Sequence, residues 1–476
     1  MMPGCWLGPP AHGVRGWRLE RMAPFVYNRC YAMPTTFRRV SVLVLASVLL
    51  ACATRGATPT SEPSTEAPMK TPSVLDSSAE QYVKLVLAVG QHDADYVDAY
   101  YGPEAWAKEA EAAKLPLPVI GERAAALVKQ VEAVPVPGDA LVAMRRRFLL
   151  TQLSALGARV RMLSGETLKF DEESQALYAA RDPGHTEAEF EAVLAELERL
   201  VPGQGSLSER LERFRKDFVI PSDKLDAVFR AAIEESRRRT LKHVALPAHE
   251  TFTLEYVNNK PWGGYNWFKG SAKSVIQINT DLPLFIMRAI DLAAHEGYPG
   301  HHVYNALLEQ HLVHERGWVE FSVYPLFSPM SLIAEGSANH GIELAFPDAE
   351  AYLRDVLFPL AGLDPKRAAG YVRMEELTEK LSYVVNEVAR RYLDGTMSRE
   401  EGRDWLVRYG LLSPERATQR MAFIDHNRSY VINYNLGRDM VKQYVERKAG
   451  SGASHERRWE VFRELLSSPA LPADLR

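Results

Sequence analysis

The chain has 476 residues, of which 46% are hydrophobic and 25% are charged, and its formal net charge at pH 7 is −4. These values are ordinary for a soluble globular protein, exclude a largely disordered chain, and show no sign of the basic surface that nucleic-acid binding needs. Because the 3 cysteines, Cys5, Cys30 and Cys52, all precede residue 53, the folded body holds neither a disulfide framework nor a cysteine-ligated zinc site.

The first predicted element is an export signal that begins at Met33. Residues 1–32 fit no pattern, and we interpret them as an over-extended gene start. Arg38 and Arg39 precede an apolar run at residues 40–51. That run is shorter than the about 20 residues that cross a membrane, but it has the length of a signal-peptide core. It ends in LLAC at residues 49–52, which resembles the bacterial lipobox. We therefore predict a signal peptide at residues 33–51 and lipidation of Cys52; the alternative is a buried apolar helix with an incidental cysteine.

The next segment, residues 52–76, is rich in Thr, Ser, Pro, Ala and Glu. Such a composition cannot pack a core and is typical of a flexible tether. Signal, lipidated cysteine, tether and globular domain follow in the order expected of an exported lipoprotein. We therefore expect a lipid anchor in a membrane of the bacterial cell envelope. Ala53 follows the cysteine where an aspartate would favour the inner membrane, so we expect the outer membrane.

Residues 77–476 are predicted to form a single domain of the mainly α (α+β) class. Residues 77–245 carry apolar residues near helical spacing. The β-rich stretch that follows predicts strands at residues 251–257, 265–268 and 274–279, just before the most informative motif. Further helices are expected at residues 282–296, 331–345, 366–394, 399–409 and 431–447.

That motif is DLAAHEGYPGHH at residues 291–302. In a helical HExxH pattern, two histidines four residues apart bind one zinc ion and the glutamate acts as general base. Here Pro299 occupies the position of the second histidine. On an unbroken helix His301 would point away from His295, and His302 would lie about 10 Å along the axis. A shared metal therefore requires a break in the helix, which Pro299 and Gly300 can supply. Either His301 or His302 can then be the second ligand.

A third ligand is expected from the next predicted helix, where Glu335 opens the segment EGSANH. Two histidines and a glutamate leave one position open for water, as catalytic zinc sites do. Asp291 lies one helical turn before His295 and is a candidate to orient that imidazole through its other ring nitrogen. Glu296, beside His295, is the candidate general base.

The segments HEGYPGHH and AEGSANHGIEL resemble the bacterial "domain of unknown function 885" family, which is grouped with the gluzincin metallopeptidases. That family shows HExxPGHH, then EGWAxYxE on the next helix, then PGQAxxYxxG near the C-terminus. The matching positions are His295, Glu296, Pro299, Gly300, His301 and His302 in the first motif, Glu335, Gly336, Ala338 and Glu343 in the second, and Tyr434 and Gly437 in the third. The chain departs from the family at Ser337, at His340 and at Arg428-Ser429-Tyr430, which stand in place of Trp, an aromatic residue and PGQ.

The resemblance covers most of residues 77–447 and implies further site residues. Gluzincins commonly use a Tyr, His or Arg from a late helix to stabilise the oxyanion that forms on the attacked carbonyl. Tyr434 is the first candidate for this role, with Tyr430 and Arg428 as alternatives; core packing is the competing interpretation of the two tyrosines. The strand at residues 274–279 resembles the edge strand that holds extended substrates in that clan.

The predicted function is therefore a zinc-dependent hydrolase of the cell envelope, with one Zn²⁺ per chain and a peptide as substrate. Glu296 would take the proton from a zinc-activated water and pass it to the leaving amine. Two alternatives stay open: a non-catalytic lipoprotein that binds peptides or a partner on a retired peptidase scaffold, and a zinc amidase that acts on a non-peptide substrate. The sequence does not set the oligomeric state.

Overall fold

The computed structural model describes residues 73–476 except residue 261. The predicted signal peptide, Cys52 and most of the predicted tether lie outside the described residues. The first helix, α1 (Val74–Val89), starts at Ser73, whose hydroxyl accepts a hydrogen bond from the Asp76 backbone amide while the Asp76 carboxylate caps Ser73 in return. The folded body therefore begins a few residues before the predicted start at residue 77. Within the described part of the chain, no helix is long and apolar enough to cross a membrane.

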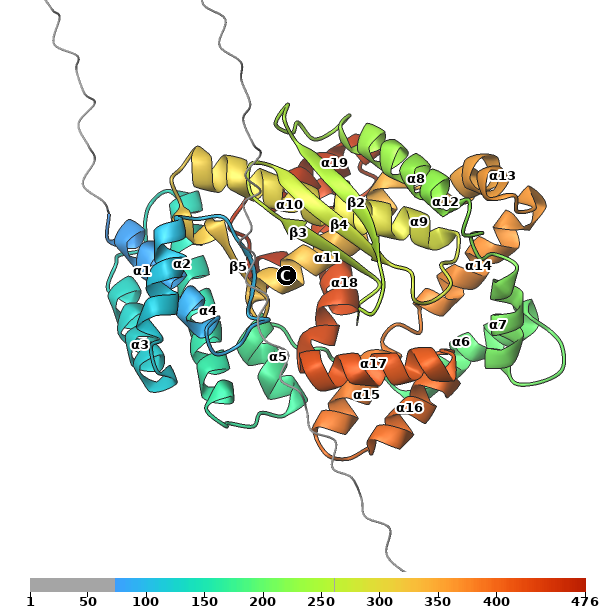
Figure 1. Ribbon diagram of the computed structural model, residues 1–476, viewed down its shortest axis with the longest axis horizontal. Coiled ribbons are helices and arrows are strands. Elements are labelled where there is room, and N and C mark those ends of the chain that lie inside the picture. Colours follow the sequence, from blue (N-terminus) through green and yellow to red (C-terminus); the bar gives the residue numbers. More distant parts are fainter. Residues whose placement is uncertain (1–72, 261) are drawn as a thin grey trace, which may run out of the picture. The chain divides into compact units, whose positions relative to one another are not determined.

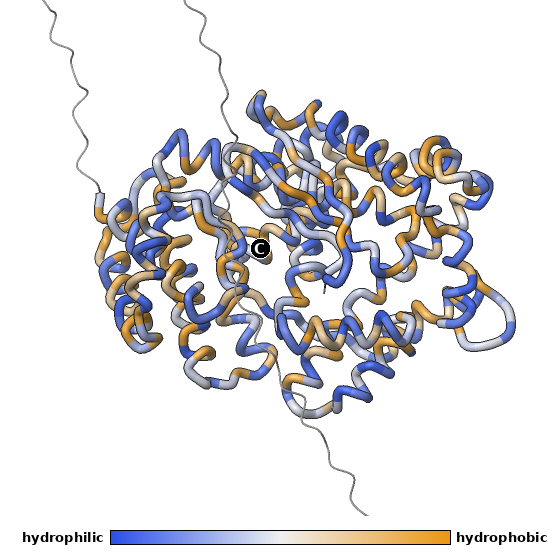
Figure 2. The backbone as a smooth tube through the Cα atoms, viewed as in Figure 1, coloured by the Kyte–Doolittle hydropathy of each residue, from blue (hydrophilic) through white to orange (hydrophobic). Residues whose placement is uncertain are grey.

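The first half of the folded body is helical, as predicted. Side-chain caps fix several of the helix starts, among them those at Asp139, Thr186 and Ser206. Apolar and polar residues alternate along these helices (Figure 2), so each buries one stripe against its neighbours. The helices after α1 are α2 (Glu104–Ala113), α3 (Leu117–Glu132), α4 (Ala140–Leu163), α5 (Phe170–Tyr178), α6 (Glu187–Leu200), α7 (Leu207–Lys216) and α8 (Leu225–Thr240).

The predicted β region forms a three-stranded sheet of β2 (Thr251–Val257), β3 (Gly264–Phe268) and β4 (Lys273–Asn279). The strand order is β2-β4-β3, with β4 parallel to β2 and antiparallel to β3. The expectation that residues 274–279 form an edge strand is wrong, because β4 is paired on both sides. Residues 287–297 form the helix that carries the first half of the HEGYPGHH motif, here called the motif helix. Among the described strands, the unpaired sheet edge beside this helix belongs to β3.

A second sheet was not predicted from the sequence. It pairs β1 (Val97–Tyr100) with β5 (Val323–Pro325) in antiparallel register. These strands have four and three residues and lie far apart in the chain. So short a segment gives too few alternations for a pattern to be recognised.

The second half of the folded body is again mainly helical, which confirms the predicted fold class. The predicted helix at residues 282–296 begins only at Met287, and the one at residues 366–394 is divided at residues 380–383. The elements are α9 (Met287–Leu292), η1 (Ala293–Gly297), α10 (His301–Leu308), η2 (Glu309–His314), η3 (Val319–Ser322), α11 (Pro329–Ala345), α12 (Ala349–Tyr352), η4 (Leu353–Leu357), α13 (Phe358–Ala361), η5 (Pro365–Arg367), α14 (Ala368–Glu379), α15 (Val384–Leu393), α16 (Arg399–Arg408), α17 (Pro414–Asn427), η6 (Arg428–Val431), α18 (Ile432–Ala449), α19 (His455–Leu466) and η7 (Pro472–Leu475).

Helices α11 and α18 cross in close contact at the centre of the folded body (Figure 1). The crossing point is Gly336 against Gly437: a Cβ on Gly336 would lie 2.4 Å from the carbonyl group of Gly437. Any side chain there would force the helices apart. Because Glu335 precedes Gly336 and Tyr434 lies one turn before Gly437, this contact brings both functional candidates to one place.

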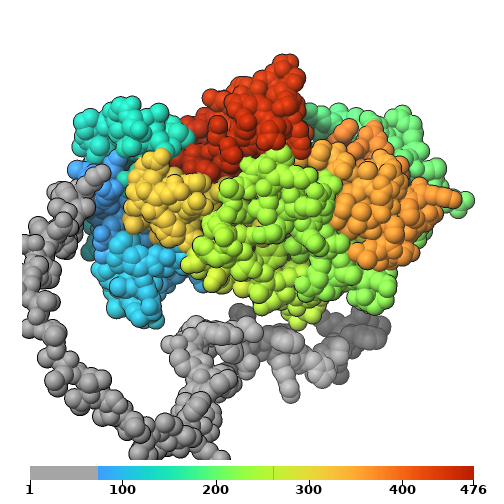
Figure 3. All heavy atoms as spheres, turned by 90° about the horizontal axis from the view of Figure 1, so that it is seen from above, coloured from blue at the N-terminus to red at the C-terminus, as the bar shows by residue number. Residues whose placement is uncertain are grey.

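The three-stranded sheet packs over α10 and the motif helix (Figure 1). From above, the yellow-green sheet segment lies beside the yellow segment that contains α10 and the orange segment that contains α12–α14 (Figure 3). The motif helix thus has the sheet on one side and α11 on the other, where Glu335 is located.

Candidate metal centre

The motif helix breaks where the sequence predicts a break. Residues 293–297 form a π-helical turn, Tyr298 is extended with φ −123° and ψ 113°, and α10 begins at His301. The Gly300 amide donates to the Ala294 carbonyl at 2.9 Å, which folds the turn back onto the preceding helix. A Cβ on Gly300 would lie 1.8 Å from the carbonyl oxygen of His295, so only glycine fits there.

The break brings His295, His301 and Glu335 together. Each offers one ligand atom, and the three atoms lie within 4.8 Å of one another. Glu335 Oε2 is 3.2 Å from His295 Nε2 and 3.7 Å from His301 Nε2. The two imidazole rings stand at 89° with centroids 4.7 Å apart. Two histidine nitrogens and one carboxylate oxygen are the donor types that catalytic zinc sites use, so these three residues could hold a metal ion.

The Glu335 carboxylate has two different oxygens. Oε1 accepts a hydrogen bond of 2.7 Å from the Tyr430 hydroxyl. Oε2 is buried and faces the two imidazole nitrogens, but in the described part of the chain no donor makes a well-formed hydrogen bond to it. A buried carboxylate oxygen without a donor is costly unless a cation faces it. The residues therefore fit a metal ion, which Oε2 and the two imidazole nitrogens would share.

The electrostatics of the centre also favour a cation. Burial alone would lower the pKa of His301, but the charges of Glu335, Glu296 and Asp98 raise it to about 9. Burial alone would raise the pKa of Glu335, but His295 and His301 hold it well below its usual value. These carboxylates make positive charge favourable at this point, and a divalent metal ion can replace the imidazole protons.

Asn339 orients His295. Its side-chain amide donates to the Tyr434 carbonyl at 3.0 Å, so its oxygen is left to accept from His295 Nδ1, also at 3.0 Å. A proton on Nδ1 leaves the lone pair of Nε2 free for a metal. The predicted orienting residue, Asp291, does not make this contact: its carboxylate lies 3.4 Å from Arg288, and burial raises its pKa to about 6. Asp291 lies one helical turn before His295, but the Nδ1 atom of His295 faces Asn339 on α11 instead.

His302, the alternative ligand, is turned away from the metal centre. Its ring is fully buried, with Nε2 3.0 Å from Glu250 Oε2 and Nδ1 2.9 Å from the Ser274 hydroxyl. Both ring nitrogens are therefore occupied. α10 begins at His301, and consecutive side chains on an α-helix point about 100° apart. Only one of the two histidines, His301 or His302, can therefore face Glu335.

Glu296 lies beside the ligands and is 4% exposed. Its carboxylate has no hydrogen-bond partner among the described residues, and Oε1 lies 3.0 Å from where a Cβ on Gly264 would stand. The Asn266 side-chain amide donates to its backbone carbonyl at 2.6 Å and ties the turn to β3. Glu296 thus keeps a free carboxylate between the metal ligands and the edge strand, where a general base would be needed.

The three oxyanion candidates have different surroundings. Tyr434 is partly exposed, and its hydroxyl has no partner within residues 73–476 as described. Tyr430 already donates its hydroxyl to Glu335. Arg428 is engaged by the buried Glu173, with Nε 2.6 Å from the carboxylate. Among the described residues, only the Tyr434 hydroxyl is left without a partner; Tyr430 instead holds Glu335, and Arg428 holds Glu173.

Asp98 lies near enough to this centre to be affected by the charge of His301, and neither Asp98 nor its partner Tyr265 was a candidate from the sequence. Asp98 lies on β1 and accepts a hydrogen bond from the Tyr265 hydroxyl on β3. Burial raises the pKa of Asp98 to about 6, although Tyr265 and the charge of His301 lower it. The DADYVDAYYGP stretch at residues 93–103 is polar and aromatic. That composition could have drawn attention to Asp98, but nothing local indicates that β1 lies near the motif.

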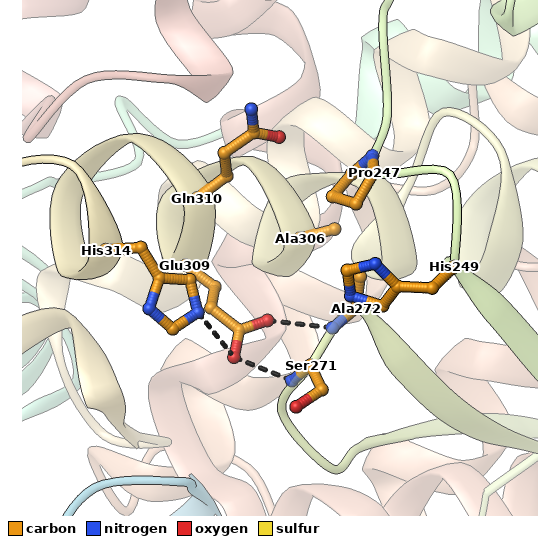
Figure 4. Close-up of a pocket in the computed structure, with 8 residues that line it drawn as sticks. All are labelled: Pro247, His249, Ser271, Ala272, Ala306, Glu309, Gln310 and His314. Atoms are coloured by element: carbon orange, nitrogen blue, oxygen red, sulfur yellow. Dashed lines mark hydrogen bonds and ion pairs between the residues drawn. The ribbon is translucent and has the colours of Figure 1, made fainter. Parts of the chain in front are cut away.

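A separate cavity of about 300 Å³ lies between the turn after β3 and helix η2 (Figure 4). Glu309 points into it and accepts the backbone amides of Ser271 and Ala272 at 2.6 and 2.8 Å. His314 adds a contact of 3.5 Å to the same carboxylate. Glu309 therefore fixes the β3–β4 turn, and the cavity contains none of the metal-centre residues.

No protein-family model matches the sequence, and no curated protein matches it. Solved structures that match the chain include two lipoproteins. One is a "putative lipoprotein" from Colwellia psychrerythraea, with 16% identity and a TM-score of 0.47 over 84% of this chain and 74% of that one. The other, a "putative lipoprotein of unknown function" from Shewanella oneidensis, has 10% identity and a TM-score of 0.40 over 84% and 89% of the two chains.

Proposed function

We propose that this protein is a zinc-dependent hydrolase of the gluzincin type that cleaves peptide amide bonds and is held at the cell envelope by a lipid on Cys52. The observation that carries the proposal is the unpartnered Oε2 of Glu335, which faces the Nε2 atoms of His295 and His301. Glu296 adds a free carboxylate next to these ligands.

Bound zinc would supply Lewis acidity, which activates water near neutral pH and polarises a carbonyl. Glu296 takes the proton of the attacking water and delivers it to the leaving amine. The Tyr434 hydroxyl donates a hydrogen bond to the oxygen on which negative charge develops. Tyr430 and Asn339 hold Glu335 and His295 in position for the metal.

The edge of β3 is suited to align an extended peptide. β3 pairs only with β4 among the described strands, and Gly264 at its start lies against the Glu296 carboxylate. A peptide that hydrogen-bonds along this edge would pass the general base, as in β-strand addition. The role expected for residues 274–279 thus moves to residues 264–268.

The test measures zinc and hydrolysis in the same purified protein. We expect about one zinc per chain after dialysis, as in a catalytic three-ligand site. Zinc should be lost in His295→Ala and Glu335→Ala but retained in His314→Ala, which changes an exposed histidine. With zinc bound, cleavage of a peptide library should stop in Glu296→Gln.

Failure to bind zinc and failure to cleave peptides would reject different parts of the proposal. No zinc after loading at micromolar concentration would reject the metal centre. Zinc without cleavage of any peptide would reject the peptidase and leave a zinc amidase or a non-catalytic lipoprotein.

A further inference from the structure

Four arginines on three helices lie near enough for their charges to act on one another. Arg416 and Arg420 come from α17, Arg288 from α9 and Arg215 from α7. Burial lowers the pKa of Arg416, and the charges of the other three lower it further. Like charges that act on one another in this way repel, so the cluster favours bound anions.

The described residues supply too few anionic partners for these four arginines. Arg215 lies 3.5 Å from Glu375 and Arg288 lies 3.4 Å from Asp291, both longer than a good charge-assisted hydrogen bond. Arg416 donates to the carbonyl of Pro283 at 3.1 Å.

Arg420 has no acceptor at all in the described part of the chain. Its guanidinium lies 5.3 Å from the ring centroid of Phe423. A fully exposed arginine would be satisfied by water, but Arg420 is only partly exposed, and burial lowers its pKa below the usual value. Its donors are thus partly withdrawn from water without receiving a protein partner, which is unfavourable until a ligand binds.

Tyr434 links this cluster to the metal centre. Its ring lies 6.2 Å from that of Phe423, one turn after Arg420 on α17. Burial raises the pKa of Tyr434 well above its usual value; the charge of Glu335 adds to this rise and the charge of Arg420 opposes it. On the other side, a Cβ on Gly263 would lie 3.6 Å from Arg288, so the cluster also borders the start of β3.

We propose that Arg420, with Arg416 and Arg288, binds a carboxylate of a substrate that lies along the edge of β3 at the candidate metal centre. The inference rests on the proposed function and names its substrate class: short peptides that carry a free C-terminal carboxylate. A guanidinium binds a carboxylate through two parallel N–H···O bonds, and Arg420 has its donors free for them. An acidic side chain carries the same group, so the experiment separates the two sources.

The experiment compares tripeptide libraries of one composition in free-acid and C-terminal amide forms. Binding is measured by calorimetry to the zinc-loaded Glu296→Gln protein, in which bound peptides should stay intact. Since hydrogen bonds to charged groups contribute about 1.5–3 kcal/mol, we expect the free acids to bind about 10–100-fold more tightly than the amides. The Arg420→Met change should remove this preference, Arg420→Lys should keep part of it, and Arg403→Met on exposed α16 should leave it unchanged.

Equal binding of acids and amides, or no binding of either, would overturn the inference. A preference that survives in a correctly folded Arg420→Met protein would do so as well. If amides that contain glutamate bind as tightly as free acids, the carboxylate is a side chain and the terminal assignment is wrong. These outcomes are distinct from failure of the proposed function: a protein that discriminates acids from amides but cleaves no peptide keeps the carboxylate site and loses the peptidase.

Discussion

Two clusters of the same residue types lie on opposite sides of the turn at residues 298–302. In one, His301 faces Glu335, which is held by a tyrosine hydroxyl. In the other, His302 faces Glu250, which is held by the hydroxyl of Tyr298 at 2.6 Å. Both clusters are buried and both pair an imidazole with a carboxylate.

The clusters differ in whether every carboxylate oxygen has a hydrogen-bond donor. Around Glu250 both carboxylate oxygens have donors, because Arg237 occupies Oε1 at 2.9 Å while His302 and Tyr298 share Oε2. Around Glu335 one oxygen has no donor. A complete network fixes the fold, whereas an incomplete one is stabilised by a ligand. The types of residue present therefore do not distinguish the structural cluster at Glu250 from the candidate metal centre at Glu335.

Removing each histidine in turn should distinguish the two clusters most clearly. We expect His301→Ala to lose zinc, because two remaining ligands do not hold a catalytic ion. His302→Ala should keep zinc but unfold more easily by about 1–3 kcal/mol, since Glu250 loses a buried donor. Zinc analysis and urea unfolding on both variants measure the two effects. Loss of zinc in His302→Ala alone would reverse the assignment.

The next largest effect concerns the general base. Glu296→Gln should reduce peptide hydrolysis by about 10²–10⁴-fold at unchanged zinc content, since glutamine cannot accept the proton. Glu343→Gln, at a half-exposed position on α11, is the matched control and should keep full activity. Activity of Glu296→Gln within a factor of about three of the parent would exclude this carboxylate as the base.

A smaller effect is expected at the residue that orients His295. Asn339→Ala should weaken zinc binding about 10–100-fold, as changes to groups that hold metal ligands do. Asp291→Asn should leave the affinity nearly unchanged, because its carboxylate contacts Arg288. Competition with a chelator of known affinity measures both. The opposite order would restore Asp291 to the role expected from the sequence.

The smallest expected effect is the pH dependence of the stability that Glu250 contributes. Burial raises the pKa of Glu250, but hydrogen bonds from His302, Tyr298 and Arg237 outweigh it and lower the pKa to about 2. A depressed folded-state pKa stabilises the fold above the unfolded value of about 4.3, and this contribution is lost as the pH falls toward 2.

The measurement is the free energy of unfolding of the parent and Glu250→Gln between pH 7 and pH 2. The difference should be constant near pH 7 and should shrink below about pH 4.3. A difference that does not change with pH would mean that Glu250 is not ionised in the folded protein.

The local features of the chain could be predicted from the order of its residues. Helical and alternating patterns predicted the α-rich body and the strands at residues 251–279, because burial of one face imposes a period on the chain. Pro299 and Gly300 predicted the break in the motif helix, because one lacks an amide proton and the other lacks a Cβ. His295, Glu296 and Glu335 were candidates from spacing and residue type alone.

Which of these groups face one another depends on how the helices and strands pack. The direction in which α10 restarts separates His301 from His302. The contact of Gly336 with Gly437 brings α18 to Glu335. Tyr430 thereby becomes a hydrogen-bond partner of Glu335, whereas the Tyr434 hydroxyl has no partner among the described residues. Asn339, Asp98 and the arginines around α17 come from segments far apart in sequence. Their roles depend on distances set by packing, and no local pattern encodes such distances.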